Sequence, residues 1–295
     1  MIEHDFILHQ LSEYSDQHND WPLAEWRLAL EDINESPGQH HWLCADPVYI
    51  HPDRSEALLL AHEELEITHE EAEQLANLIN QHYKDEPWEL HVGSTHRWYI
   101  KSLQDYELQT RTINSVKGKN IFDYLPSGND ARYWQQCMNE LQMLLHTSDI
   151  NQQREEKGLL QINSLWLWGY GKRASEAGLN WDKIYSDDAV LNGLGIISGC
   201  DVARLTDELE DIEDTKGNIL VYIQRLEEAS QQQDIFTWLE ELQYLEKYWF
   251  EPLLKKMEEL PELLVTLLID NNMAFQVSRK HMKRWWRSKN RNKLY

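Results

Sequence analysis

The sequence predicts a mixed α/β protein that combines a smaller α+β part with a larger α/β part. In the first half, short strand patterns alternate with two amphipathic helix patterns. In the second half, continuous apolar runs are separated by helix patterns, which is typical of a parallel sheet covered on both faces. No internal repeat or low-complexity tract interrupts this order. These observations favour a layered fold.

The first half contains strand, helix and hairpin signals in turn. Its predicted elements are strands over residues 41–50 and 58–61, a helix over about 70–83, a hairpin of strands 88–92 and 96–100, and a helix over about 130–146. The first helix follows a T-x-x-E capping box formed by Thr68 and Glu71. The second helix places its apolar residues on one face. This half therefore predicts a sheet with helices packed on it.

The second half alternates apolar strands with helices. Its predicted elements are strands over residues 162–168, 183–186, 201–205, 217–224 and 263–270, with helices over about 187–200 and 235–258. Pro252 lacks a backbone N–H and is expected to kink the last helix. We expect residues 1–44 to pack on the core, residues 45–150 to form the α+β subdomain, and residues 151–295 to form the α/β domain.

Composition and charge exclude several classes of protein. Hydrophobic residues make up 41% of the 295 residues, with 13 Trp and 13 Tyr, which is enough for a large core. The 51 acidic residues outnumber the 28 Lys and Arg, so general binding to nucleic acid is disfavoured. No apolar run is long enough to cross a bilayer, residues 1–10 lack the basic start and long apolar stretch typical of a signal peptide, and three cysteines are an odd count. We therefore expect an acidic, cytoplasmic protein without membrane insertion.

The end of the sequence has the opposite charge to the rest. Residues 279–295 contain eight Lys or Arg and no acid, together with Trp285 and Trp286. Such a segment can stack on nucleobases, lie at a membrane surface or dock on an acidic protein. Because the rest of the chain is strongly acidic, we expect the segment to pack on the surface of that acidic part. We expect burial of the two tryptophans to determine whether the segment is ordered. Binding of a protein partner is its expected second role.

Five motifs in the second half carry a resemblance. They are HTSDINQQREEKG, NSLWLWGYGK, DKIYSDDAVLNGLGIISGCDV, VYIQRLEEASQQQD and LLIDNN, the last followed by Lys280-His281. In order and spacing they resemble the archaeal-type cofactor-independent phosphoglycerate mutases of the alkaline-phosphatase superfamily, and among these the bacterial RpfE-type regulatory proteins. The resemblance implies an alkaline-phosphatase-like layered α/β domain. It also implies that residues 45–150 correspond to the insertion domain of the mutases.

The resemblance further implies a degraded site for two metals. The mutases hold two divalent ions (Mn, Zn or Mg) through Asp and His ligands and use a serine nucleophile. The corresponding positions here are Glu227, Gln231, Asp270, Asn271 and His281. Two of them are amides where the mutases have imidazoles, and the segment that bears the serine has no counterpart. We therefore expect no catalytic residue and no metal cofactor, although a ligand supplied from elsewhere in the chain would restore one.

Three basic residues are candidate contacts for an anion. Arg54, Arg154 and Lys172 lie in stretches where the mutases carry substrate-facing groups, whereas Trp168 stands where the mutases have an arginine. Surface ion pairs are the alternative role for these residues in an acidic protein. If the three groups converge, they would bind a phosphorylated small molecule, unless Trp168 fills the site.

Three functions remain open on this basis. The first is a non-catalytic, mutase-like regulatory protein (a pseudoenzyme) that acts through a protein partner whose identity the sequence does not reveal. The second is a metal-dependent phosphoglycerate mutase or phosphatase with residual activity. The third is a sensor that binds a phosphorylated metabolite without converting it. The replaced imidazoles favour the first.

Overall fold

The computed structural model has a mixed α/β fold, as the sequence predicted. It describes residues 21–31, 33, 40–52, 56–60, 63–171, 181–212, 216–231, 234–269 and 273–282. The described residues of Glu13–Arg204 and Gly217–Tyr222 form one compact unit, here called the large unit. Those of Leu205–Lys216 and Ile223–Tyr295 belong to a second, the small unit.

An antiparallel sheet of five strands forms the centre of the large unit. The strands are β1 (His41–Pro52), β2 (Ala57–Leu60), β3 (Trp88–Val92), β4 (Trp98–Ser102) and β5 (Ser164–Trp168). Their order is β2-β1-β4-β3, and β5 also pairs with β1. The long strand β1 is therefore the central one, and its residues Leu43 and Ala45 face Ile100 and Leu167 across the ladders.

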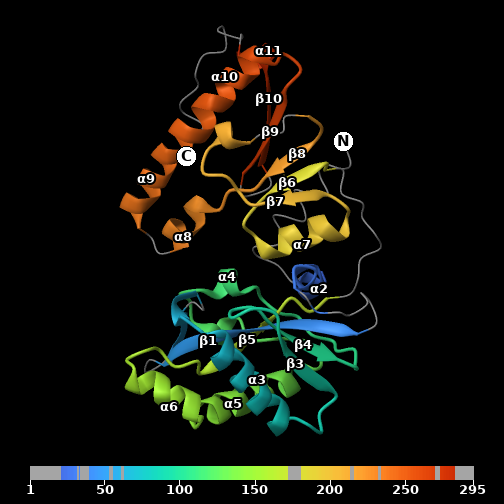
Figure 1. Ribbon diagram of the computed structural model, residues 1–295, viewed down its shortest axis with the longest axis vertical. Coiled ribbons are helices and arrows are strands. Elements are labelled where there is room, and N and C mark those ends of the chain that lie inside the picture. Colours follow the sequence, from blue (N-terminus) through green and yellow to red (C-terminus); the bar gives the residue numbers. More distant parts are fainter. Residues whose placement is uncertain are drawn as a thin grey trace. The chain divides into compact units, whose positions relative to one another are not determined.

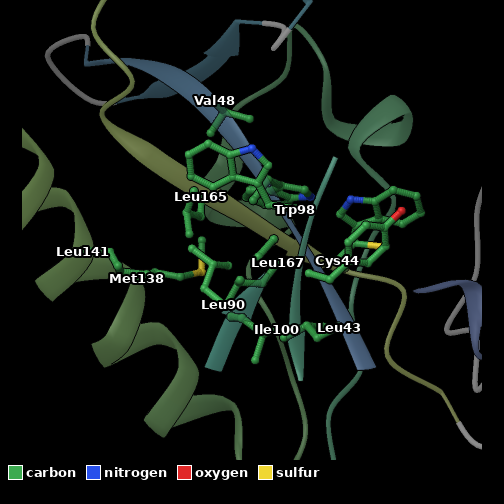
Figure 2. Packing of buried hydrophobic residues seen from close by; sticks show 14 of the residues in the cluster. Leu43, Cys44, Val48, Leu90, Trp98, Ile100, Met138, Leu141, Leu165 and Leu167 are labelled. Carbon is green, nitrogen blue, oxygen red and sulfur yellow. The ribbon is translucent and has the colours of Figure 1, made fainter. Parts of the chain in front are cut away.

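Three helices cover one face of this sheet (Figure 1). They are α3 (His69–His82), α5 (Ala131–His146) and α6 (Asp149–Glu156). The capping box predicted at the start of α3 is confirmed, since the Thr68 side chain accepts from the Glu71 N–H and the Glu71 carboxylate accepts from the Thr68 N–H. Figure 2 shows Met138 and Leu141 of α5 directed towards sheet residues such as Leu165. Full burial of such a side chain contributes roughly 1.5–3 kcal/mol to stability.

The direction predicted for the strand at residues 162–168 is wrong. We expected it in a parallel sheet, but β5 runs antiparallel to β1, with Trp168 opposite Cys44 and Ser164 opposite Val48. All five residues of β5 are buried. A continuous apolar run indicates that both faces of a strand are covered, and it does not fix the direction of that strand. Strand β5 thus places a segment beyond residue 150 in the sheet of the predicted α+β subdomain.

A separate parallel sheet of three short strands completes the large unit. It consists of β6 (Lys183–Tyr185), β7 (Asp201–Ala203) and β8 (Ile219–Val221), in the order β7-β6-β8. Helix α7 (Ala189–Ile197) connects β6 to β7. The parallel pairing predicted for these three strands is confirmed.

The short helix α2 (Leu23–Leu28) lies between the antiparallel sheet and α7 (Figure 1). The backbone N–H of Ala24 donates to the Gly169 carbonyl at 3.0 Å, which ties α2 to the end of β5. On its other side α2 meets α7 so closely that a Cβ on Gly193 would lie 1.8 Å from the Trp26 carbonyl oxygen. Glycine is therefore required at position 193 for the two helices to approach.

The remaining described elements of this unit are α4 (Ile113–Val116) and the 3-10 turns η1 (Glu63–Leu65) and η2 (Ile121–Asp123).

The small unit consists mainly of helices and one hairpin. Its elements are the 3-10 turn η3 (Leu209–Asp211), α8 (Arg225–Gln231), α9 (Ile235–Leu245), the π-helical turn η4 (Glu246–Phe250), α10 (Glu251–Glu259), β9 (Leu264–Ile269), β10 (Met273–Ser278) and α11 (Arg279–Met282). The helix predicted over 235–258 is thus divided, with Pro252 in the first turn of α10 directly after the π-helical turn. Proline cannot donate to the preceding turn, which accounts for the irregularity at this place.

The last predicted strand also pairs differently from our expectation. Strand β9 does not join the parallel sheet, because it pairs antiparallel with β10 in a sheet of two strands. No strand was predicted for residues 273–278. The partner that determines the direction of β9 was therefore missed.

Substitution of Gly193 tests the close approach of α2 and α7. Gly193→Ala places a methyl group against the Trp26 backbone, which cannot rotate away as a side chain would. We expect a loss of about 1–3 kcal/mol, as for overpacked sites. A thermal melt followed by circular dichroism measures it. Ile196→Ala, on an exposed position of the same helix, is the control and should change the melt little. An unchanged melting temperature for Gly193→Ala would contradict the packing of α2 on α7.

Candidate functional site

The predicted metal positions lie in the small unit or just outside the described residues. Glu227 lies on α8, is half-buried and accepts a hydrogen bond from Gln224 Nε2 at 3.3 Å. His281 is exposed on α11, where its Nδ1 accepts from the Ser278 N–H at 3.2 Å. That contact leaves only Nε2 of the imidazole for a metal.

The other three positions add no described ligand. The backbone of Gln231 ends α8, but its side chain lies outside the described residues, as do Asp270 and Asn271. Within the described ranges, no three His, Cys, Asp or Glu side chains are grouped so that they could hold a metal ion. The described donors therefore do not fit the two-metal arrangement that the resemblance implies, which needs several carboxylates and imidazoles around each ion.

Of the three predicted anion contacts, only Arg154 is described. Arg54 and Lys172 lie outside the described residues. The Arg154 side chain is fully buried: its Nε donates to the Leu160 carbonyl at 2.8 Å, its Nη1 to Glu71 Oε2 at 3.0 Å, and its Nη2 to the Leu65 carbonyl. Contrary to our expectation, Arg154 therefore holds α6 to α3 and presents no surface to a soluble ligand.

Glu71 joins this ion pair to the start of α3. Its Oε2 accepts from the Thr68 N–H at 2.9 Å, from the Thr68 hydroxyl at 3.0 Å and from Arg154. Burial tends to raise the pKa of Glu71, but the hydrogen bonds from Thr68 and the charge of Arg154 outweigh burial and lower that pKa below its ordinary value. One carboxylate thus serves both as a helix cap and as the counter-ion of a buried arginine.

A second buried ion pair lies on the opposite face of the sheet. Arg27 of α2 and Asp46 of β1 form two parallel hydrogen bonds, both of 2.7 Å. Asp46 also accepts from the Trp168 indole N–H at 2.7 Å and from the Trp98 backbone N–H at 3.3 Å. Two donors therefore satisfy each carboxylate oxygen, and Asp46 has no exposed surface. We call Arg27, Asp46, Trp98, Tyr99 and Trp168 the Asp46 cluster.

Aromatic rings enclose the guanidinium of this cluster. The Arg27 guanidinium carbon lies 4.7 Å from the centre of the Tyr99 ring and 4.9 Å from that of the Trp168 ring. Burial acts to lower the pKa of Arg27, but the charge of Asp46 and the hydrogen bonds to it raise that pKa well above its ordinary value. Arg27 is therefore a permanent cation that compensates Asp46. Trp168 supplies a neutral donor and a ring face to this ion pair.

A further acidic group adjoins the Asp46 cluster. The Glu31 side chain accepts from Arg97 Nε at 2.6 Å and from the Tyr99 hydroxyl at 2.9 Å, and only 4% of it is exposed. Cys44 lies close to Arg27, yet burial raises the pKa of its thiol far above the ordinary value. A neutral, buried thiol is not a nucleophile. The groups of this region thus fix α2 to the sheet and offer no exposed reactive atom.

The sequence contains one signal for the Asp46 cluster that did not enter our predictions. Asp46 is the single charged residue within the apolar run from Trp42 to Ile50. A carboxylate in a buried strand requires a cation, because an unpaired buried charge is very costly. No structure was predicted for residues 21–28, so Arg27 was not identified as that cation.

The carboxyl ends of the parallel strands are where an α/β sheet places a ligand. After β6, the Asp188 carboxylate caps α7 by accepting from the Leu191 N–H at 2.7 Å. The Ser186 hydroxyl oxygen accepts from the Asp188 N–H at 2.9 Å. Asp187 pairs with Arg204 at 3.3 Å on the surface. These groups are engaged in capping and pairing within the large unit.

Comparison with known proteins relates the chain to phosphoglycerate mutases. Residues 46–151, about a third of the chain, match the family model described as 2,3-bisphosphoglycerate-independent phosphoglycerate mutase. The chain is 22% identical over 228 residues to the enzyme of that name from Methanosarcina acetivorans, which covers 70% of this chain and 57% of that mutase. It is 35% identical over 92 residues to the mutase from Methanothrix thermoacetophila, covering 29% and 23% of the two chains.

Solved structures give weaker likenesses. The PH0037 protein from Pyrococcus horikoshii has a TM-score of 0.47 at 10% identity and covers 88% of this chain and 66% of its own. The cofactor-independent phosphoglycerate mutase from Thermoplasma acidophilum has a TM-score of 0.37 at 15% identity, covering 72% and 63%.

Together the sequence matches show that the chain is similar to the 2,3-bisphosphoglycerate-independent phosphoglycerate mutases. This confirms the mutase resemblance that the sequence motifs indicated, while the RpfE-type designation stays a prediction. The chain spans a little more than half the length of the first of these mutases and about a quarter of the second.

Among the described residues, no helix combines the length and the apolar composition needed to cross a bilayer.

The Asp46 cluster is tested by removing its cation. Arg27→Met leaves the Asp46 carboxylate buried without a counter-ion, and we expect a loss of about 3–5 kcal/mol. In a chain of this size that corresponds to a fall in melting temperature on the order of 10 °C. Arg132→Met, at an exposed position of α5, is the matched control. The double variant Arg27→Met/Asp46→Asn removes the charge while keeping an acceptor for Trp168, so it should recover part of the loss. A double variant no more stable than Arg27→Met would contradict this account.

The pH dependence of stability tests the role of Glu71. Its pKa is lower in the folded than in the unfolded chain, where the ordinary value is 4.5. The resulting stabilisation is therefore complete above about pH 4.5 and is lost as the pH falls through the lower, folded pKa. Glu71→Gln should be less stable than wild type by about 1 kcal/mol or more at pH 7. The difference should shrink in urea titrations taken progressively below pH 4.5. If the difference in stability between wild type and Glu71→Gln stays constant down to pH 3, the charge of Glu71 does not contribute to the stability of the fold.

Proposed function

We propose that this chain is a non-catalytic, phosphoglycerate-mutase-related regulatory protein of the RpfE type, which acts through a protein partner. One observation carries the proposal. Two buried charges, Asp46 in the region that matches the mutase family model and Arg154 just beyond it, are bonded to groups of the protein itself. Groups used in this way stabilise the fold and are withdrawn from a substrate or metal.

The chemistry of the predicted ligand positions supports the same function. Gln231 and Asn271 stand where the mutases have imidazoles. A carboxamide is a neutral oxygen ligand, whereas sites for Zn or Mn use imidazole nitrogen and carboxylate oxygen. With two imidazoles replaced, the remaining Glu227, Asp270 and His281 are too few for two ions.

The proposed setting is the cytoplasm. Cys44, Cys137 and Cys200 are all free thiols, and the first two are buried. Free thiols fit a reducing compartment.

Two alternatives have support of their own. The relatives are named as mutases, which favours a metal-dependent mutase or phosphatase with residual activity. Arg54 and Lys172 keep basic charge at mutase-like positions, which favours a sensor of a phosphorylated metabolite. The first alternative requires bound metal, and the second requires only an anion.

Metal content and turnover separate the proposal from the enzyme. The full chain is dialysed with Mn, Zn or Mg, desalted and measured by plasma mass spectrometry. It is then assayed with 2- and 3-phosphoglycerate and with p-nitrophenyl phosphate. We expect less than one ion per chain and no turnover above the rate without protein. One or two ions per chain, with a melting temperature that a chelator lowers and with turnover, would overturn the proposal in favour of the enzyme.

A thermal-shift series separates the proposal from the sensor. Phosphoglycerates and sugar phosphates are added to wild type and to Lys172→Ala and Arg54→Ala. We expect no change in the wild-type melting temperature. A rise that either substitution abolishes would show a specific anion site and would replace the proposal by the sensor.

A further inference from the structure

The hairpin of the small unit carries an apolar face that is half-buried at Val265, Leu267 and Val277 and exposed at Phe275. The register of β9 with β10 pairs Leu267 with Phe275 and Val265 with Val277. Side chains of directly paired residues lie on the same side of an antiparallel hairpin, and every second residue shares that side. One side of the hairpin is therefore formed by these four apolar residues, which we call the hairpin face.

This face is incompletely buried. Phe275, in the middle of β10, is 48% exposed, although a core aromatic residue normally has almost no exposed surface. A sheet of two strands is marginally stable by itself and needs a third strand or another segment packed on it. The hairpin face therefore requires a cover.

The chain contains a segment with suitable chemistry immediately after the hairpin. Strand β10 leads through the single-turn helix α11 into residues 283–295, which lie outside the described residues and are here called the C-terminal segment. It contains six Lys or Arg, no acid, and the adjacent Trp285 and Trp286. Extended chain from Met282 to Trp286, four residues, spans up to about 14 Å. The distance along β10 from Ser278 back to Phe275, three residues, is about 10 Å. The tryptophans can therefore fold back to the hairpin face.

The basic charge of the C-terminal segment also complements acidic residues next to the hairpin in the sequence. Exposed acids follow one another at the end of α10 and in the turn that leads into β9, namely Glu258, Glu259 and Glu262. A second copy of the hairpin has the same acids ahead of its own β9, and like charges across an interface are unfavourable. A basic segment pairs with them instead. The chemistry thus favours the C-terminal segment over a second copy as the occupant.

We propose that the C-terminal segment folds back onto the hairpin face, with Trp285 and Trp286 covering Phe275 and the basic residues lying near the acids of α10. This inference goes beyond the proposed function and does not depend on it. The aromatic pair supplies most of the attraction, because exposed ion pairs contribute little. The segment also closes the apolar face of a hairpin that is otherwise exposed to aggregation.

Fluorescence quenching of bimane by tryptophan tests the proposal. In a Cys200→Ser background, Phe275→Cys is labelled with bimane in the full chain, and Met143→Cys, exposed on α5 of the large unit, is labelled as control. Trp285→Phe/Trp286→Phe should relieve quenching at position 275 and leave position 143 unchanged. Lys289→Gln/Arg291→Gln/Lys293→Gln should change neither signal appreciably. No relief at position 275 would overturn the proposal. Relief that disappears on dilution would also overturn it, by showing that the segment of a second copy is the occupant.

Proteolysis provides a test without a label. Trypsin cleaves after Arg287 and Lys289, and the rate follows the open fraction when opening is rapid. Phe275→Ser should accelerate this cleavage about tenfold or more, since it removes a large part of the covered apolar surface. Phe122→Ser, at an exposed position of the large unit, should not. If wild type is already cleaved as fast as Phe275→Ser, the segment is not docked on this face and the proposal is overturned.

Discussion

The buried ion pair between Arg27 and Asp46 determines how the large unit is assembled. Moving two charges out of water is costly, and the cost is offset only when geometry and further hydrogen bonds are favourable. Here Asp46 receives four hydrogen bonds and the guanidinium lies between two aromatic rings. Because an unpaired partner would be severely destabilising, α2 can occupy only the position that brings Arg27 to Asp46. Once α2 is placed, its contact at Gly193 positions α7 and, through α7, the parallel sheet.

The ion pair between Arg154 and Glu71 repeats this design on the other face of the sheet. Arg154 reaches from α6 to the first turn of α3, where Glu71 already completes a capping box. One carboxylate therefore couples the start of a helix to a helix about eighty residues later in the chain. On each face of the sheet an arginine thus bonds to a carboxylate and to the backbone: Arg27 to one carbonyl and Arg154 to two. These contacts explain why Arg154 acts within the fold.

The sequence was sufficient for elements whose signals are local. Their patterns depend on spacing within a few residues. These elements are the capping box at Thr68, the hairpin of β3 and β4, helix α5 and the three parallel strands, and all are present. The errors concern pairing at long range. Strand β5 is buried on both sides whether its neighbours are parallel or antiparallel, so its composition carries no information on direction. Strand β9 depends on a partner, β10, that was not predicted. At the candidate site, the resemblance predicted Arg154 to be an anion contact. Its actual role depends on bonds to Glu71 and to the carbonyls of Leu65 and Leu160. Glu71 and Leu65 are both distant from Arg154 in the sequence.

Internal charge compensation bears on the proposed loss of a metal site. In a two-metal enzyme, the cations balance the charge of converging carboxylates, and removing them leaves repulsion that weakens the fold. In the described part of the large unit, protein groups balance the two buried ion pairs, since Arg27 pairs with Asp46 and Arg154 with Glu71. If the mutase ligand set is lost, as we propose, these two ion pairs give a reason why the large unit keeps its fold, because a fold does not depend on the chemistry of a site.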